Sequence, residues 1–286
     1  NLIIPIPSVP IFATAFTDAL GKNMFEMVGY LIPADMNKSG LQFGYINPMW
    51  SLSISRNFDF AFRRYQKAWL VDSRNAASLT INNPINFGEY PSSNHLFYAG
   101  ATIVNHNVTV GKKTDKETGE LIPLDKSSFV DLPVPESGND GFITLGYQWL
   151  NRRPHKINNI APKDGFGISA LVDYANKNLF GDFSFTRFES DVFANLPVNK
   201  DGSLVAYFRL KSMIVSGKPP AQEYVGLTDD KPIYIQGLAP SRYIPENHNP
   251  RGWSGYRLGD KLLFGTAELR QAAGPISLNL ISDFGN

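Results

Sequence analysis

Apolar and polar residues alternate along most of this chain in segments of about ten residues, and turn-forming residues separate the segments. No longer stretch keeps the 3.6-residue period of an amphipathic helix. Alternation with period two is the pattern of β-strands, because successive side chains of a strand point to opposite faces. The sequence therefore predicts strands joined by turns rich in Gly, Asn, Asp, Lys or Pro.

The first half of the chain contains predicted strands of uneven clarity. A hairpin is expected over residues 10–33. One strand is expected over 41–55, and Pro48 inside it predicts a bulge or a kink, because proline cannot donate a ladder hydrogen bond. Residues 61–75 are basic, and the pattern does not place them. Further strands are predicted at 76–82 and 95–105.

The alternation becomes cleaner in the second half, and it separates charge from aliphatic residues. Four strands are predicted at 142–150, 165–174, 183–194 and 203–214. The last two of these carry opposite charges on their polar faces, so we expect cross-strand ion pairs between them. The residues involved are Arg187, Glu189 and Asp191 on the first of the two, and Arg209 and Lys211 on the second.

The last two predicted strands each place one carboxylate opposite their aliphatic residues. Glu268 lies on the polar face of strand 261–270, and Asp283 lies on the polar face of strand 276–284. Two neighbouring carboxylates in a partly desolvated place need a positive counter-charge. Arg251, in the preceding Gly- and Pro-rich segment, can supply it as a bidentate partner, so we expect Arg251 to reach both carboxylates. An ordinary solvated loop arginine is the alternative.

About eleven strands joined mostly by short turns must either curl into a closed barrel or split into two sheets. Closure also removes exposed strand edges. Strands with charge on one face and aliphatic residues on the other predict an antiparallel transmembrane β-barrel. We therefore expect one partial barrel domain over 1–286, with long surface loops near 111–140 and 216–259. A linker between two domains at 111–140 is less favoured, because the β pattern resumes unchanged at Phe142.

The amino-acid composition argues against several classes of function. The chain has 27 Lys and Arg against 26 Asp and Glu, a net charge of +1, so there is no electrostatic case for nucleic-acid binding. No run of about 20 apolar residues is present, so no transmembrane helix is expected. This criterion does not detect the strands of a membrane barrel, because apolar and polar residues alternate in them. The chain contains no cysteine, which excludes disulfides, thiol catalysis and cysteine zinc sites.

Candidate catalytic and metal-binding motifs are lacking in the sequence. There is no G-x-S-x-G elbow, no phosphate-binding loop and no G-x-G-x-x-G, so no enzymatic activity is expected. The four histidines are scattered and lack metal-ligand spacing, so neither a metal nor another cofactor is predicted. They are His95, His106, His155 and His248.

The last part of the chain contains P-R-G-W at 250–253, Glu268 in G-T-A-E-L-R, and I-S-D-F-G at 281–285. With these motifs, residues from about 160 to 286 resemble the C-terminal barrel of the BamA/TamA superfamily of outer-membrane proteins, the bacterial surface antigen family. The family's V-R-G-[FY] motif on the sixth surface loop is similar to P-R-G-W at 250–253. Its inward glutamate matches Glu268, and its F-x-D-x-G motif matches I-S-D-F-G at 281–285, with Ile281 in place of the family's Phe. The turn T-D-A-L-G-K-N near the N-terminus is similar to barrels fused behind a TolB-like propeller.

The resemblance implies a barrel of sixteen strands in which the sixth surface loop tucks into the lumen between the eleventh and twelfth strands. Asn286 would then end the thirteenth strand, so we expect the chain to be a segment of a longer protein. The implied loop lock in the lumen consists of Arg251, Gly252, Trp253, Glu268, Asp283 and Gly285. Trp253 is either a packing anchor in the lumen or a plain loop aromatic.

The function implied is non-enzymatic insertion or translocation of protein or lipid at the bacterial outer membrane. The implied partners are outer-membrane lipid or lipopolysaccharide and other envelope proteins in a complex. Two other classes stay open: an accessory or scaffold barrel without insertase activity, and a soluble β-sandwich that binds glycans. The sandwich predicts that the aliphatic residues pack inward.

Overall fold

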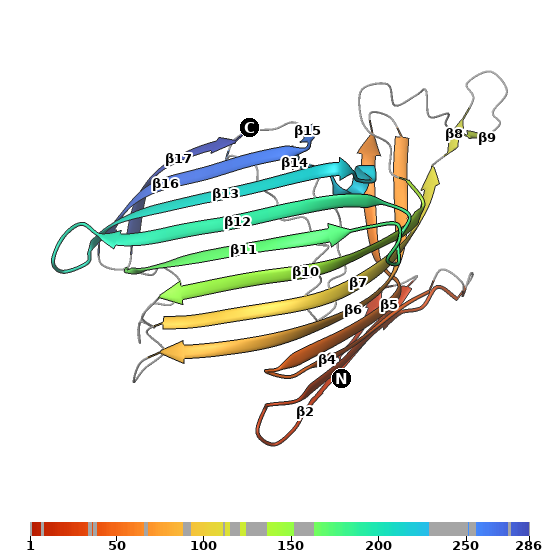
Figure 1. Ribbon diagram of the computed structural model, residues 1–286, viewed down its shortest axis with the longest axis horizontal. Coiled ribbons are helices and arrows are strands. Elements are labelled where there is room, and N and C mark those ends of the chain that lie inside the picture. Colours follow the sequence, from red (N-terminus) through yellow and green to blue (C-terminus); the bar gives the residue numbers. More distant parts are fainter. Residues whose placement is uncertain are drawn as a thin grey trace.

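The computed structural model shows an all-β protein built around one long antiparallel sheet (Figure 1). The residues that the structure describes are 2–6, 9–33, 36, 39–65, 68–87, 93–110, 112–114, 121–123, 136–151, 163–228, 251, 256–273 and 276–285. Within them, thirteen strands follow one another in the sheet in the order of the sequence. No helix among the described residues has the length and apolar character needed to cross a membrane.

The strands of the sheet, in spatial order, are β1 (Leu2–Ile6), β2 (Val9–Thr17), β3 (Met24–Tyr30), β4 (Gly40–Ile46), β5 (Trp50–Tyr65), β6 (Ala68–Phe87), β7 (Ser93–Val110), β10 (Gly138–Asn151), β11 (Gly165–Ala175), β12 (Ser184–Pro197), β13 (Leu204–Lys218), β16 (Lys261–Ala273) and β17 (Ile276–Gly285). Two short ladders are not hydrogen-bonded to this sheet: β8 (Lys112–Thr114) with β9 (Leu121–Pro123), and β14 (Val225–Thr228) with β15 (Tyr256–Gly259). A 3-10 helix, η3 (Ala221–Glu223), lies between β13 and β14.

Every neighbouring pair in the sheet is antiparallel, so the connections alternate between its two ends. We call the end at which β13 stops and β16 starts the loop end, because it carries the longest connections. The opposite end, where β12 turns into β13, is the turn end. Figure 1 shows that the sheet curves strongly from β2 to β17. β13 and β16 are the eleventh and twelfth strands in spatial order.

The expected single strand over 41–55 is wrong, because Pro48 lies in a tight turn between β4 and β5 and not inside a strand. Asn47 closes this turn by accepting hydrogen bonds from the backbone N–H groups of Met49 and Trp50. The bulge lies further along β5, where the register with β6 shifts between Arg56 and Asp59. Asn57 adopts a left-handed φ of 49° there, which asparagine tolerates better than most residues.

Residues 61–75, which the pattern does not place, belong to β5 and β6. These strands form a long hairpin and are paired as far as Tyr65 and Ala68. Its far end projects beyond the neighbouring strands (Figure 1). Strand pairing therefore extends through a basic segment whose side chains do not alternate in polarity.

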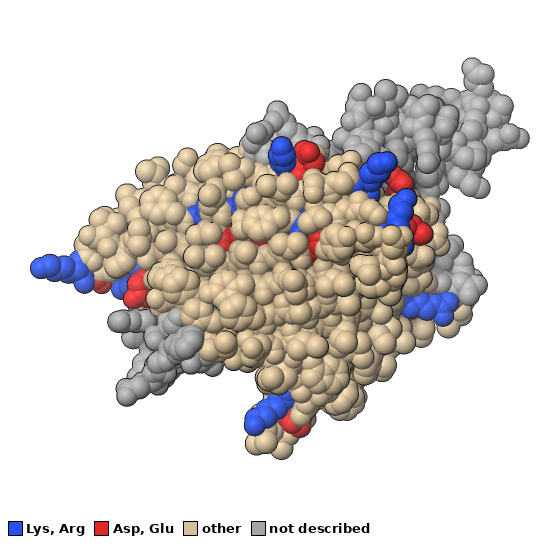
Figure 2. Space-filling model, viewed as in Figure 1, with Lys and Arg blue, Asp and Glu red and all other residues tan. Residues whose placement is uncertain are grey.

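The two faces of the sheet have the reverse polarity of a soluble protein. Large aliphatic side chains point outward and are exposed, such as Ile81 at 59% and Leu145 at 62%. Their neighbours on the inner face are polar and buried, such as Thr144 at 0% and Asp173 at 1%. Figure 2 shows a surface of mostly uncharged side chains over β6, β7 and β10. Alternation along each strand thus directs apolar residues outward and polar residues inward.

The inner face also holds an apolar cluster near the loop end. Its members come from five strands of the sheet and from β14, which packs against the inner wall. They are Phe142, Ala175, Phe185, Val215, Val225 and Leu262. This packing fixes the start of the connection from β13 to β16 against the inner surface of the sheet.

Aromatic rings gather on the outer face at the turn end. Phe25, Tyr45 and Trp50 form a contiguous group, with ring centroids 4.7 Å and 4.4 Å apart. Across β7, β10 and β11, Trp149 stacks on His95 at 5.4 Å and meets Phe166 edge-on at 4.8 Å. These residues share the face of the exposed aliphatic side chains, so they form an aromatic band along one rim.

Candidate functional site

Arg251 joins the last two strands of the sheet through hydrogen bonds to Glu268 and Asp283. Its Nη2 donates to Glu268 Oε1 at 2.8 Å and to Asp283 Oδ1 at 2.8 Å. Its Nε and its backbone N–H both donate to Asp283 Oδ2, at 2.7 Å and 2.8 Å. Asp283 therefore receives a bidentate guanidinium contact and a backbone contact from one residue.

A second arginine supports Glu268 from its own strand. Arg270 Nε donates to Glu268 Oε2 at 2.7 Å, and the Arg270 guanidinium lies 4.3 Å from the centroid of the Tyr207 ring. We call Arg251, Glu268, Arg270 and Asp283 the C-terminal cluster. It contains two carboxylates and two guanidinium groups, so the charges of its named members balance.

The C-terminal cluster is asymmetric in exposure. The side chains of Glu268 and Asp283 are 10% and 4% exposed, whereas that of Arg251 is 50% exposed. The two carboxylates raise the pKa of Arg251 above its usual value, chiefly through the hydrogen bonds to Asp283 and Glu268. Arg251 thus brings a permanent positive charge from the β13–β16 connection to two carboxylates on the wall.

Four of the five charged residues expected on the inner face of β12 and β13 form two ion pairs with each other. Arg209 donates from Nε to both oxygens of Asp191, at 3.0 Å and 3.1 Å. Lys211 Nζ lies 2.8 Å from Glu189 Oε1. These pairs cross between adjacent strands, as the antiparallel register allows.

Arg187 pairs elsewhere than with β13. Its Nε and Nη2 donate to Asp173 Oδ2 on β11, at 3.0 Å and 2.7 Å, and its Nη1 donates to Glu223 on η3. The Arg187 guanidinium also lies 5.7 Å from the centroid of the Phe142 ring. Arg187 therefore links the wall of the sheet to the segment that follows β13.

Sequence reasoning missed a second set of inner-face groups near the loop end. Asp72 Oδ2 accepts from Arg74 Nε at 2.9 Å and lies 2.9 Å from His106 Nδ1. One nitrogen of His106 and one carboxylate oxygen each of Asp140 and Glu223 lie within 4.8 Å of one another. The central cluster, as we call it, comprises Asp72, Arg74, His106, Asp140, Asp173, Arg187 and Glu223. Its members are far apart in sequence. The one signal in the sequence is that those on strands occupy inward-facing positions close to the loop end of the sheet.

The remaining predicted lock residues are placed in part. Gly285 is the last residue of β17 and lies opposite Phe264 in the register. Gly252 and Trp253 lie outside the described residues. The structure thus brings together Arg251, Glu268 and Asp283.

Among solved structures, the chain is similar to BamA from Haemophilus ducreyi lacking POTRA domains 1-3. The match has a TM-score of 0.56 at 13% sequence identity and covers 97% of this chain. The fold resembles the BamA barrel. The chain spans about half of the solved BamA chain, 54% of its length. No protein-family model and no curated protein sequence matches this chain.

The BamA-like fold explains why one sheet can have a polar inner face and an exposed apolar outer face. In a barrel, the inner face surrounds a lumen and the outer face contacts the surroundings. The C-terminal and central clusters both lie on the inner face. The β-sandwich alternative needs aliphatic residues packed inward between two sheets, and the exposed aliphatic face of this single sheet is the opposite arrangement.

Proposed function

We propose that this chain forms the barrel wall of a bacterial outer-membrane protein. The observation that carries the proposal is the reversed polarity of the sheet, with exposed residues such as Leu145 outside and buried residues such as Asp173 inside. Acyl chains favour contact with the aliphatic face, and many buried polar groups of the inner face have inner-face partners, such as Asp173 with Thr144 and Arg187. A soluble protein of this form would expose a large apolar patch to water.

The aromatic band supports the same proposal. Outer-membrane barrels carry aromatic girdles where the apolar band meets the head groups. Phe166 on β11 belongs to the band at the turn end, and Tyr174 lies outward near the loop end of the same strand, 46% exposed. They are about 26 Å apart along an extended strand, and a strand tilt of about 40° reduces this to roughly 20 Å of height, a little less than the apolar height of roughly 25 Å typical of such barrels. Short turns face the periplasm in these proteins, so the turn end is assigned there.

The C-terminal cluster supports a loop lock in the lumen. Arg251 comes from the connection that leaves the sheet at the loop end, yet it reaches Glu268, the eighth residue of β16, on the inner face. The implied lock also includes Gly252, Trp253 and Gly285. Its role in this proposal is to hold the long surface loop inside the barrel, where it stabilises the wall near β16 and β17.

The activity that this arrangement favours is non-enzymatic insertion or translocation of protein or lipid at the outer membrane. Its support is the BamA-like fold together with the Arg251 contacts. The partners would be outer-membrane lipid, including lipopolysaccharide, and other envelope proteins. A scaffold barrel without insertase activity is the second candidate, because the balanced ion pairs of β12 and β13 suit a static wall equally well.

The absence of cysteine gives a direct test of the membrane assignment. Leu79 points outward and Ser78 points inward on the same strand, so Leu79→Cys and Ser78→Cys form a matched pair. Each variant of the full-length protein would carry an environment-sensitive fluorophore in vesicles containing acyl-chain nitroxides. We expect strong quenching at position 79 and weak quenching at position 78. Equal weak quenching at both positions would contradict a lipid-facing outer surface.

The two candidate roles separate in a reconstituted assay. Vesicles containing the full-length protein would be mixed with a urea-unfolded outer-membrane barrel, whose folding is followed by its shift in electrophoretic mobility without heating. An insertase accelerates this folding several-fold over empty vesicles. An unchanged rate, with the quenching result intact, favours the scaffold role.

A further inference from the structure

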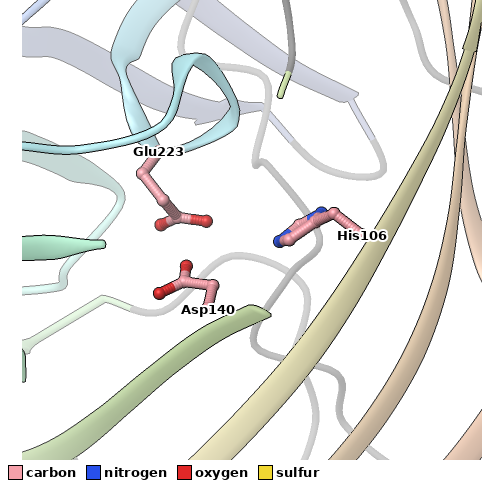
Figure 3. A group of neighbouring side chains, drawn as sticks. All are labelled: His106, Asp140 and Glu223. Carbon is pink, nitrogen blue, oxygen red and sulfur yellow. The ribbon is translucent and has the colours of Figure 1, made fainter. Parts of the chain in front are cut away.

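Three side chains from distant parts of the chain converge inside the sheet near its loop end (Figure 3). His106 lies near the end of β7, Asp140 near the start of β10, and Glu223 on η3. Each of the three residues offers one atom that could bind a metal ion, and these three atoms all lie within 4.8 Å of one another. In Figure 3 the two carboxylates face each other, and the imidazole ring points toward the gap beside them.

All three groups are buried, and two of them have polar atoms that the other described residues leave unsatisfied. His106 is 2% exposed, Asp140 is 0% exposed and Glu223 is 4% exposed. Among the described residues, His106 Nε2 and both carboxylate oxygens of Asp140 have no hydrogen-bond partner. A buried acceptor without a partner is strongly unfavourable, so atoms of this kind that point into one space indicate a missing ligand.

The surrounding groups hold these donors in the orientation that a metal ligand needs. His106 Nδ1 lies 2.9 Å from Asp72 Oδ2, which also accepts from Arg74. A proton on Nδ1 that is donated to Asp72 leaves the lone pair of Nε2 directed at Asp140 and Glu223. A carboxylate behind the outer nitrogen of histidine is the usual second-sphere arrangement of histidine metal ligands.

Glu223 is oriented in a comparable way from the other side. Arg187 donates to Glu223 and is itself held by two hydrogen bonds to Asp173. Gln222 exchanges hydrogen bonds with the backbone of Glu136, donating at 2.6 Å and accepting at 3.0 Å. The η3 segment is therefore fixed beside the start of β10, with Glu223 directed at Asp140.

The charges of the central cluster favour a divalent cation. Its described members include four carboxylates, on Asp72, Asp140, Asp173 and Glu223. Its two guanidinium groups, on Arg74 and Arg187, offset half of that charge when His106 is neutral. One ion of charge +2 would balance the rest, in a buried place where unbalanced charge is most unfavourable.

We propose that His106, Asp140 and Glu223 bind a divalent first-row transition-metal ion, for which Zn²⁺ is the natural probe. One imidazole nitrogen with two carboxylate oxygens suits Zn²⁺, whereas Mg²⁺ and Ca²⁺ prefer oxygen ligands alone. Donors of one tetrahedral zinc ion lie roughly 3.4 Å apart, so rotations that move the carboxylates by about 1 Å complete the site. The fourth position is available to water.

The ion would act as a structural clamp and not as a catalyst. It would join β7, β10 and η3, and η3 begins the connection that carries Arg251. The bound metal therefore fixes the start of that connection to the wall, while Arg251 fixes a later point. This inference rests on the buried side chains alone and holds whether the barrel is an insertase or a scaffold.

The test uses full-length, tag-free protein in detergent, stripped with a chelator and titrated with Zn²⁺ by calorimetry. We expect one equivalent to bind, and Co²⁺ to give visible absorption bands from the same site. His106→Gln and Asp140→Asn should each weaken Zn²⁺ binding at least tenfold, because changes even to the partners behind metal ligands weaken binding by about 10–100-fold. His95→Gln is the matched control, because His95 lies on the same strand and bonds to Tyr147 outside the cluster.

Thermal unfolding with and without Zn²⁺ gives a second measurement, which can still be interpreted when one of the variants folds poorly. Zn²⁺ should raise the midpoint of thermal unfolding of the wild-type and His95→Gln proteins, and should leave that of His106→Gln unchanged. Equal Zn²⁺ affinity in His106→Gln and wild type would overturn the proposal. Absence of binding, with Asp140→Asn more stable than wild type in every buffer, would also overturn it in favour of a proton shared by Asp140 and Glu223.

Discussion

The C-terminal cluster and the central cluster lie on the same inner face, but they obtain their positive charge differently. In the C-terminal cluster, Arg251 and Arg270 match the charges of Glu268 and Asp283, and Arg251 stays half exposed. In the central cluster, carboxylates outnumber guanidinium groups, and His106 and Asp140 are almost fully buried. A loop side chain completes the first cluster, whereas the second needs a charge that its described side chains do not supply.

This difference shows that a buried carboxylate stabilises or destabilises the fold according to the hydrogen-bond donors around it. Asp283 accepts three hydrogen bonds from Arg251, so removing its charge removes favourable contacts. Neither oxygen of Asp140 receives a hydrogen bond from a donor group of the described residues, and Glu223 beside it is another carboxyl group, so a neutral amide in its place relieves an unfavourable burial. Substitutions in the two clusters should therefore change stability in opposite directions.

The largest effect is expected from Arg251→Ala. It leaves Glu268 and Asp283 buried without their shared partner, and we expect the free energy of unfolding to fall by about 2–3 kcal/mol, less than for a fully buried pair because Arg251 is half exposed. Urea titration of the full-length protein in detergent, followed by tryptophan fluorescence, measures the loss. Arg251→Lys keeps the charge and should lose about half as much. An unchanged midpoint for Arg251→Ala would remove the basis of the lock.

A pair of isosteric changes tests the opposite signs directly. Glu268→Gln should lower the free energy of unfolding by about 1–2 kcal/mol, because it weakens charge-assisted hydrogen bonds to two arginines. Asp140→Asn, in metal-free buffer, should raise it by about 1 kcal/mol, because it replaces a buried carboxyl group beside Glu223 with a neutral amide. The same urea titration in the presence of a chelator compares them. Losses of equal size in both variants would abolish the distinction between the clusters.

The ion pairs between β12 and β13 give a reference value for the stability that an inner-face ion pair outside both clusters contributes. Arg209→Ala should lower the free energy of unfolding by only about 0.5–1 kcal/mol, because Arg209 and Asp191 are 31% and 19% exposed and water screens the remaining charge. The measurement is the same titration, with Arg209→Lys as control. A loss as large as that of Arg251→Ala would show that any inner-face arginine acts as a lock.

The smallest effect concerns pH. The carboxylates raise the pKa of Arg251, and a raised pKa means that its contribution to stability is fully present below the unfolded-state pKa and is lost as the pH rises through the folded-state pKa. Both values lie far above neutral pH. The stability difference between wild type and Arg251→Ala should therefore be constant from about pH 6 to about pH 10. A decline across this range would show that another titrating group carries the contact.

Much of the fold follows from sequence where polarity alternates strictly. The faces of 142–150, 165–174 and 203–214 could be predicted because a lumen and a membrane impose opposite preferences on alternate residues. The interpretation failed around Pro48, where a three-residue turn leaves almost no polar interruption between β4 and β5. Residues 61–75 were not placed because their charges do not alternate with apolar residues.

The candidate sites differ in the same way. The contacts of Arg251 were expected because Glu268 and Asp283 lie on adjacent strands whose facing can be read locally. The central cluster could not be predicted, since Asp72, His106 and Asp140 meet only through the diagonal register of β6, β7 and β10. Glu223 adds a contribution from η3, whose position depends on packing inside the sheet and leaves no periodic signal in the sequence.

The connection from β13 to β16 touches the inner wall at η3, β14 and Arg251, and this has an electrical consequence. Contacts of η3, β14 and Arg251 with the inner wall place these groups where they narrow the path for ions, so the protein should conduct weakly in a planar bilayer. Because the contact at Arg251 is half exposed while Val225 and Glu223 are buried, thermal release should begin at Arg251. Brief current steps would then report the opening of this single contact, and their frequency would rise in Arg251→Ala.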